Sequence, residues 1–157
     1  MAVVSAIKPL FENVIFLSTA SSLCIAQLVK MLIYILTHRR RKLRDTIETA
    51  IWRTGGMPSS HSAVVCSLTT SVGLTEGISS NLFVFCFVFS LVVLRDALGV
   101  RRSAGLQAKA LNQLGKQSAD KYGIEFHAVK EIQGHSPLEV VVGAFLGVFI
   151  AAGFALL

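Results

Sequence analysis

The chain has 157 residues, of which 53% are hydrophobic and only 15% are charged. Soluble domains carry about 25% charged residues, so this composition excludes an ordinary soluble domain and indicates an integral membrane protein with one domain over residues 1–157. The formal net charge is +6. Its densest part, the basic run His38–Arg44, favours a cytoplasmic loop beside anionic lipid headgroups over a nucleic-acid surface. We therefore expect membrane lipid as a partner and no nucleic acid.

Four segments are predicted to form helices in or across the membrane: Asn13–Leu36, Ser60–Thr75, Leu82–Leu98 and Leu138–Leu157. The first has about 24 residues, enough to cross a hydrocarbon core of about 30 Å and too many for a cleaved signal peptide. Lys30, about two turns from its basic end, either snorkels to the interface or has a functional role. The second segment is short and rich in Ser and Thr, so it either crosses inside the bundle or is re-entrant.

A fifth segment, Ala104–Ala119, is polar and carries apolar side chains that fit one face of a helix lying on the membrane surface: Leu106, Ala110, Leu111 and Leu114. The predicted fold is therefore all-α. It is an integral membrane bundle of about four transmembrane or re-entrant helices, with one amphipathic surface helix in addition. A homo-oligomer is compatible with four short spans.

The basic loops predict the orientation of the chain, because Lys and Arg concentrate on the cytoplasmic side. With residues 39–44 and 101–121 in the cytoplasm and four crossings, one membrane face collects Arg53, His61, Arg95, Asp96, Arg101, Arg102 and His135. Asp96 is expected in an ion pair with Arg95 or Arg101, the alternative being a metal ligand. We expect a bacterial inner membrane or an organelle membrane.

The segment R-T-G-G-M-P-S-S-H-S begins at Arg53 and has the signature of a helix N-terminus. Ser59 and Ser60 suit the cap, and the unpaired N–H groups and positive dipole end of a helix start suit a phosphate. Arg53 could hold phosphate oxygens bidentately, and His61 could donate a proton. The alternative is an ordinary loop and cap beside an interfacial histidine.

The second segment, G-H-S-P-L-E-V-V-V-G, contains a capping box formed by Ser136 and Glu139, with Pro137 at the first helical position. The box accounts for those residues but not for His135. Since His135 and Glu139 are four residues apart, the carboxylate can also reach the imidazole and activate it as a nucleophile or base. One side chain is shared by the two interpretations.

These two segments, together with R-D-A-L-G-V-R-R, resemble the divergent PAP2 family over nearly the whole chain. That family is related to the acid phosphatases and vanadium-dependent haloperoxidases. Pro58–His61 resembles the P-S-G-H motif of PAP2 phosphatases, and His135-x3-Glu139 resembles the end of their S-R-x5-H-x3-D motif. The resemblance implies His135 as nucleophile, Glu139 as its orienting carboxylate and His61 as general acid. It implies neither a cofactor nor a metal ion.

The phosphate-binding positions depart from the PAP2 pattern. Arg53 is followed by Thr instead of Pro and has no Lys seven residues before it, and Val129 stands where the third motif has Arg. Arg101 and Arg102 can replace that arginine only if residues 103–134 loop back. The predicted phosphate-binding set is therefore Arg53, Ser59, Ser60, Arg101 and Arg102.

Three functions are compatible with this sequence. The first is a membrane phosphatase that hydrolyses a lipid phosphomonoester or diphosphate at the cytoplasmic face through a histidine nucleophile. The second is a protein that binds or transports a lipid phosphate without turnover. The third is a structural membrane subunit, in which both histidine segments are merely helix starts.

Overall fold

The structure is a computed structural model that describes residues 8–37, 56–131 and 134–156. The described residues contain no β-strand, and the all-α prediction is confirmed. Residues 8–12 form a short helical segment, and the longer helices are α2 (Val14–Thr37), α4 (Ser60–Thr75), α5 (Asn81–Leu98), α6 (Val100–Tyr122) and α7 (Pro137–Ala155).

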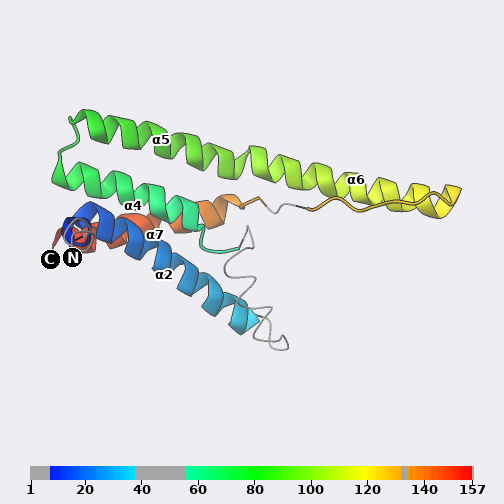
Figure 1. Ribbon diagram of the computed structural model, residues 1–157, viewed down its shortest axis with the longest axis horizontal. Helices are drawn as coiled ribbons and strands as arrows, with labels where there is room; N and C mark the ends of the chain where they lie inside the picture. The colour runs from blue at the N-terminus through cyan, green and yellow to red at the C-terminus, as the bar shows by residue number, and fades with distance from the viewer. Residues whose placement is uncertain (1–7, 38–55, 132–133, 157) are drawn as a thin grey trace.

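Helix α4 lies at the centre of the bundle, in contact with α2, α5 and α7 (Figure 1). Its buried side chains are small or β-branched, and most of them are serines: Ser60, Ser62, Ala63, Val65, Ser67, Ser71 and Val72. Small and hydroxylated residues let helices approach closely in lipid and form hydrogen bonds across their interface. The sequence of Ser60–Thr75 is short and polar for a membrane span because α4 is enclosed by other helices.

Two hydrogen-bonded contacts join α4 to its neighbours. The hydroxyls of Ser18 on α2 and Ser71 on α4 are 2.8 Å apart. On the other side, the hydroxyls of Thr69 on α4 and Ser90 on α5 are 2.6 Å apart, and Ser90 also donates to the carbonyl of Val65 at 3.0 Å. Polar side chains in these apolar helices are thus turned toward α4.

The contact of α4 with α7 depends on glycine. A Cβ at Gly143 would collide with the backbone carbonyl of Ser59, and a Cβ at Gly147 would collide with that of Ala63. These glycines are spaced four residues apart, so they lie on one face of α7 and let the two backbones touch. Helix α7 therefore holds the start of α4 in a fixed position.

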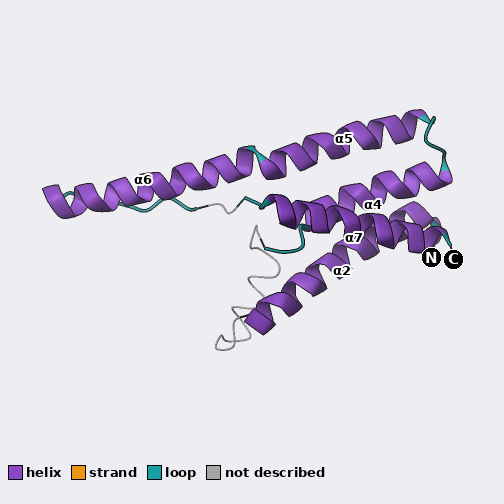
Figure 2. Ribbon diagram, turned by 180° about the vertical axis from the view of Figure 1, so that it is seen from behind, coloured by secondary structure: helices purple, strands orange, loops and turns teal. Residues whose placement is uncertain are grey.

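Helix α6 continues the line of α5 and extends beyond the bundle (Figures 1 and 2). Residues 123–131 run back along it as an extended segment. The side-chain amide of Asn112 donates to the carbonyl of Val129 and accepts its N–H, both at 2.9 Å. Near the tip, the ring of Phe126 occupies the space beside Gly115. The predicted amphipathic helix thus belongs to an arm built from α6 and its returning segment.

Three stretches of the described chain are long and apolar enough to cross a membrane: α2, the run of α5 with α6, and α7. Helix α4, with 16 residues, is about 24 Å long and falls short of that length. The lipid-facing sides of the three stretches carry exposed large apolar residues, such as Leu28, Phe85 and Phe149. An integral membrane protein is therefore supported by composition and structure alike.

The bundle has two distinct ends. The start of α2, the turn between α4 and α5 and the end of α7 lie together at one end (Figure 1). The start of α4, the junction of α5 with α6 and the start of α7 lie at the opposite end, and α2 slants away from them so that its own end lies apart (Figures 1 and 2). This second end holds both histidine segments.

Candidate active site at two helix N-termini

The first histidine segment forms the N-terminus of α4. Ser59 is the N-cap residue, and its hydroxyl oxygen accepts hydrogen bonds from the N–H of Ser62 at 3.4 Å and from the hydroxyl of Ser62 at 2.9 Å. Ser59 and Ser60 are buried, whereas His61 on the first turn is exposed. The hydroxyl of Ser59 thus serves the helix, and the phosphate contacts of Ser59 and Ser60 stay predictions.

The second histidine segment forms the N-terminus of α7, and its capping box is present. Glu139 donates its N–H to the hydroxyl of Ser136 at 3.4 Å. Its Oε2 accepts the N–H of Ser136 at 3.2 Å and lies 2.9 Å from Nδ1 of His135. One carboxylate oxygen therefore serves both the helix cap and the histidine, so the two interpretations of Glu139 hold together.

The two segments are in direct contact. The N–H of Ser59 donates to the backbone carbonyl of Glu139 at 3.0 Å. The imidazole rings of His61 and His135 have centroids 6.3 Å apart, with 63° between their planes. Since Nδ1 of His135 faces Glu139, its Nε2 is the nitrogen that a ligand can reach. The three residues predicted to be catalytic are thus brought together, although their roles stay predictions.

A cavity of about 330 Å³ opens beside the two histidines. Val92, Val93 and Ala97 of α5 form its apolar wall, and its polar lining comes from His61, His135 and Asp96. His135 is only 4% exposed, so its ring is largely shielded from solvent. Imidazoles, a carboxylate and an apolar wall suit an amphiphilic ligand with a polar end at the histidines.

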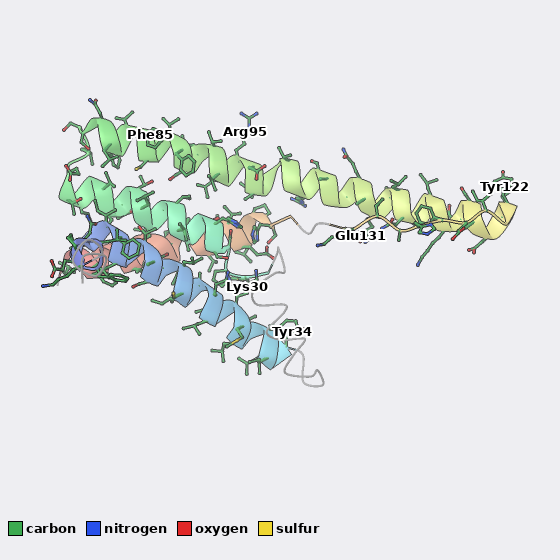
Figure 3. The ribbon with its side chains drawn as sticks, viewed as in Figure 1. Lys30, Tyr34, Phe85, Arg95, Tyr122 and Glu131 are labelled. Carbon is green, nitrogen blue, oxygen red and sulfur yellow. The ribbon has the colours of Figure 1, made fainter. Side chains whose placement is uncertain are left out.

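Asp96 also belongs to this site; the sequence placed it at the same membrane face, but predicted an ion pair with Arg95 or Arg101, or a metal ion, as its partner. Arg95 points away from the neighbouring helices (Figure 3), whereas Asp96 lines the cavity. Adjacent residues of a helix point in different directions, so only one of Arg95 and Asp96 can face the histidines. The sequence therefore could have indicated that the two residues have different surroundings. Among the described residues, no three His, Cys, Asp or Glu side chains gather closely enough to hold a metal ion.

The basic residues of the predicted phosphate site are only partly placed. Arg53 lies outside the described residues, as does the basic run at 38–44, and only the helix position of Arg101 is described. The backbone of Arg102 lies against Gly134, where a Cβ would collide with it. The chain after α6 therefore does loop back. This is the condition under which Arg101 or Arg102 could replace the arginine that is missing from the third PAP2 motif. Arg102 lies beside the segment that carries His135, and its contact with phosphate stays a prediction.

The arrangement can perform acid–base and nucleophilic chemistry. His135 is oriented by a carboxylate, a second imidazole lies near it, and the positive ends of α4 and α7 are close by. Fold and site together define a helical integral membrane protein with a histidine pair at one end of its bundle.

The chain belongs to the divergent PAP2 family, which matches residues 11–150. It is also similar to the protein named uncharacterized membrane protein YuiD of Bacillus subtilis (strain 168). The two are 36% identical over 154 residues, which cover 90% of this chain and 93% of the relative. No solved structure matches the chain.

Proposed function

We propose that this protein is a membrane phosphatase acting on a lipid phosphate, with His135 as nucleophile. The observation that carries the proposal is the pair of contacts around His135: Glu139 at 2.9 Å from Nδ1, and the ring of His61 at a centroid distance of 6.3 Å. A carboxylate on one side of an imidazole and a second imidazole on the other supply an activated nucleophile and a general acid. Family membership supports the same chemistry.

In the first step, Nε2 of His135 attacks phosphorus. A P–N bond forms while the bond from phosphorus to the leaving alcohol oxygen breaks, and that oxygen takes a proton from His61. Glu139 stabilises the positive charge that develops on the imidazole of His135. In the second step, water attacks phosphorus and gives a proton to His61, the P–N bond breaks, and inorganic phosphate leaves.

A lipid substrate is supported by the cavity. Its wall of Val92, Val93 and Ala97 is apolar, and Val92 is also exposed on the membrane-facing part of α5. A phosphate at the histidines would therefore place an attached alkyl chain against apolar side chains. A small hydrophilic phosphate ester would gain nothing from this wall.

The test is phosphate release by purified protein in mixed micelles that contain phosphatidic acid, phosphatidylglycerophosphate or a polyprenyl diphosphate. We expect release to persist with a chelator and to fall to background in His135→Ala. In His61→Ala it should fall about 10²- to 10⁴-fold, and less for p-nitrophenyl phosphate, whose leaving group needs no proton. His127→Ala, a change of an exposed histidine on the arm, is the matched control.

A labelled phosphohistidine trapped by acid-free quenching in wild-type protein, and absent in His135→Ala, would identify the intermediate. Full turnover by His135→Ala would contradict the mechanism. Binding of these lipids by folded protein, without release from any of them, would favour the second function considered above, lipid-phosphate binding or transport.

A further inference from the structure

Lys30 is a charged residue within the apolar helix α2, and a plain membrane span does not need one. It lies seven residues before the end of the helix at Thr37, and its side chain is only partly exposed. A lysine at such a depth is costly unless it reaches the interface or faces the protein. The sequence left these two alternatives open.

The structure places the stem of Lys30 against protein. A Cβ at Gly56 would lie 3.3 Å from Cε and 4.0 Å from Cγ of Lys30, so the lysine stem packs over the glycine backbone. Gly56 has φ +90°, a conformation that favours glycine. Because glycine has no Cβ, the stem of Lys30 can approach its backbone closely. In Figure 3, Lys30 lies between α2 and the segment that leads into α4.

This contact holds a positive charge close to the start of α4. Nζ is bonded to Cε, so the ammonium stays within one bond of the atom that contacts Gly56. Gly56 is three residues before the N-cap Ser59, and His61 follows on the first turn of the helix. The ammonium and the positive end of the α4 dipole thus act on the same region.

The site contains negative charges that the ammonium of Lys30 could offset. The cavity end contains the carboxylates of Asp96 and Glu139, and both would repel a phosphate dianion. A glycine in each histidine segment packs against a basic residue from another helix: Gly56 against the side chain of Lys30, and Gly134 against the backbone of Arg102. On the α4 side of the site, the positive charge of Lys30 would offset these carboxylates.

We propose that Lys30 binds the phosphate group of the ligand from the α4 side of the site, which rests on the function proposed above. The ligand chemistry that it recognises is a phosphate monoester or phosphate ion. A lipid headgroup and free inorganic phosphate share this chemistry.

The experiment measures binding in His135→Ala protein, so that turnover does not consume the ligand. Phosphatidic acid in nanodiscs and inorganic phosphate are the two probes, with phosphatidylcholine as the lipid control. Lys30→Met keeps the stem and removes the charge, Lys30→Gln is a second neutral variant, and Lys30→Arg restores the charge. Lys8→Gln is the matched control, because Lys8 is exposed, precedes α2 at the opposite end and pairs with Glu12 at 3.6 Å.

We expect Lys30→Met and Lys30→Gln to weaken binding of phosphatidic acid at least about tenfold, Lys30→Arg to retain most of it, and Lys8→Gln to retain all of it. An equal loss for inorganic phosphate assigns the contact to phosphate itself, whereas a loss confined to phosphatidic acid assigns it to a lipid-borne phosphate.

Unchanged binding in folded Lys30→Met or Lys30→Gln would overturn the proposal, as would an equal loss for phosphatidylcholine. If binding depends on Lys30 but the wild-type protein releases no phosphate from any substrate, Lys30 is upheld as a ligand-binding residue and only hydrolysis is rejected.

Discussion

Asp96 is negatively charged and lines a cavity that we propose binds a phosphate, which is also negatively charged. The presence of an aspartate there therefore needs an explanation. A carboxylate that lines the same cavity as His61 can orient the imidazole in its protonated, positively charged form. That form is the one needed by a general acid that protonates a leaving alkoxide. We therefore expect Asp96 to act as a positioning residue that orients the protonated ring of His61 toward the leaving group.

The prediction for Asp96→Asn depends on the leaving group. Release from phosphatidic acid should fall about tenfold or more, because an alkoxide needs the proton, while release from p-nitrophenyl phosphate should change little. Steady-state turnover of the two substrates measures the difference. Asp120→Asn, on the exposed part of α6, is the control. Equal slowing with both substrates would contradict a role for Asp96 in proton transfer.

The histidines and Glu139 could be found from the sequence because each belongs to a local pattern, a helix-start signal with a residue that the signal does not explain. Lys30 and Asp96 belong to no such pattern. Lys30 meets Gly56 only when α2 and α4 pack together, and Asp96 faces the histidines only when α5 packs beside them. Side-chain direction between distant segments is not encoded in the spacing of residues along either one.

At the scale of elements, the apolar helices were predicted to within two residues at their ends, because the length of an apolar run and its capping residues fix a helix in lipid. Helix α6 was predicted as Ala104–Ala119 and is Val100–Tyr122. Its polar ends carry no apolar periodicity, and its end is set by Gly123, which adopts φ +66°. The central position of α4 could not be predicted, since it depends on contacts with three other helices.

The contact between α4 and α7 gives a prediction about stability. Gly143→Ala and Gly147→Ala should each destabilise the protein by about 1–3 kcal/mol, because a methyl group must push against the backbone of α4. Gly153→Ala is the matched control on the same helix. Nothing lies within 4 Å of its Cβ position, so the change should be neutral or slightly stabilising.

Unfolding in mixed micelles, followed by loss of helical circular dichroism, measures these differences. Gly143 also adjoins Ser59, whose N–H is bonded to the carbonyl of Glu139. Gly143→Ala should therefore lower phosphate release more than Gly147→Ala does at equal loss of stability. Equal stability of Gly143→Ala, Gly147→Ala and Gly153→Ala would show that α7 does not pack on α4 through its glycines.

At the scale of the whole molecule, both histidine segments and the arm of α6 lie at one end of the bundle, and the turn between α4 and α5 lies at the other (Figure 1). The arm carries a surplus of basic residues, because residues 100–131 contain six Lys or Arg and three Asp or Glu. Basic segments close to membrane spans remain in the cytoplasm. We therefore expect the site to face the cytoplasm and the α4–α5 turn to face the opposite side.

Single cysteines introduced into a protein whose Cys24, Cys66 and Cys86 have been replaced test this orientation. Lys121→Cys lies at the tip of the arm and Ser79→Cys in the α4–α5 turn, and both native residues are exposed. A membrane-impermeant maleimide should label Ser79→Cys in intact cells and Lys121→Cys only after the cells are permeabilised. The reverse pattern would place the site on the outer side. Labelling of both only after permeabilisation would mean that α4 enters the membrane and returns to the same face instead of crossing, and the substrate would still be drawn from the cytoplasmic leaflet.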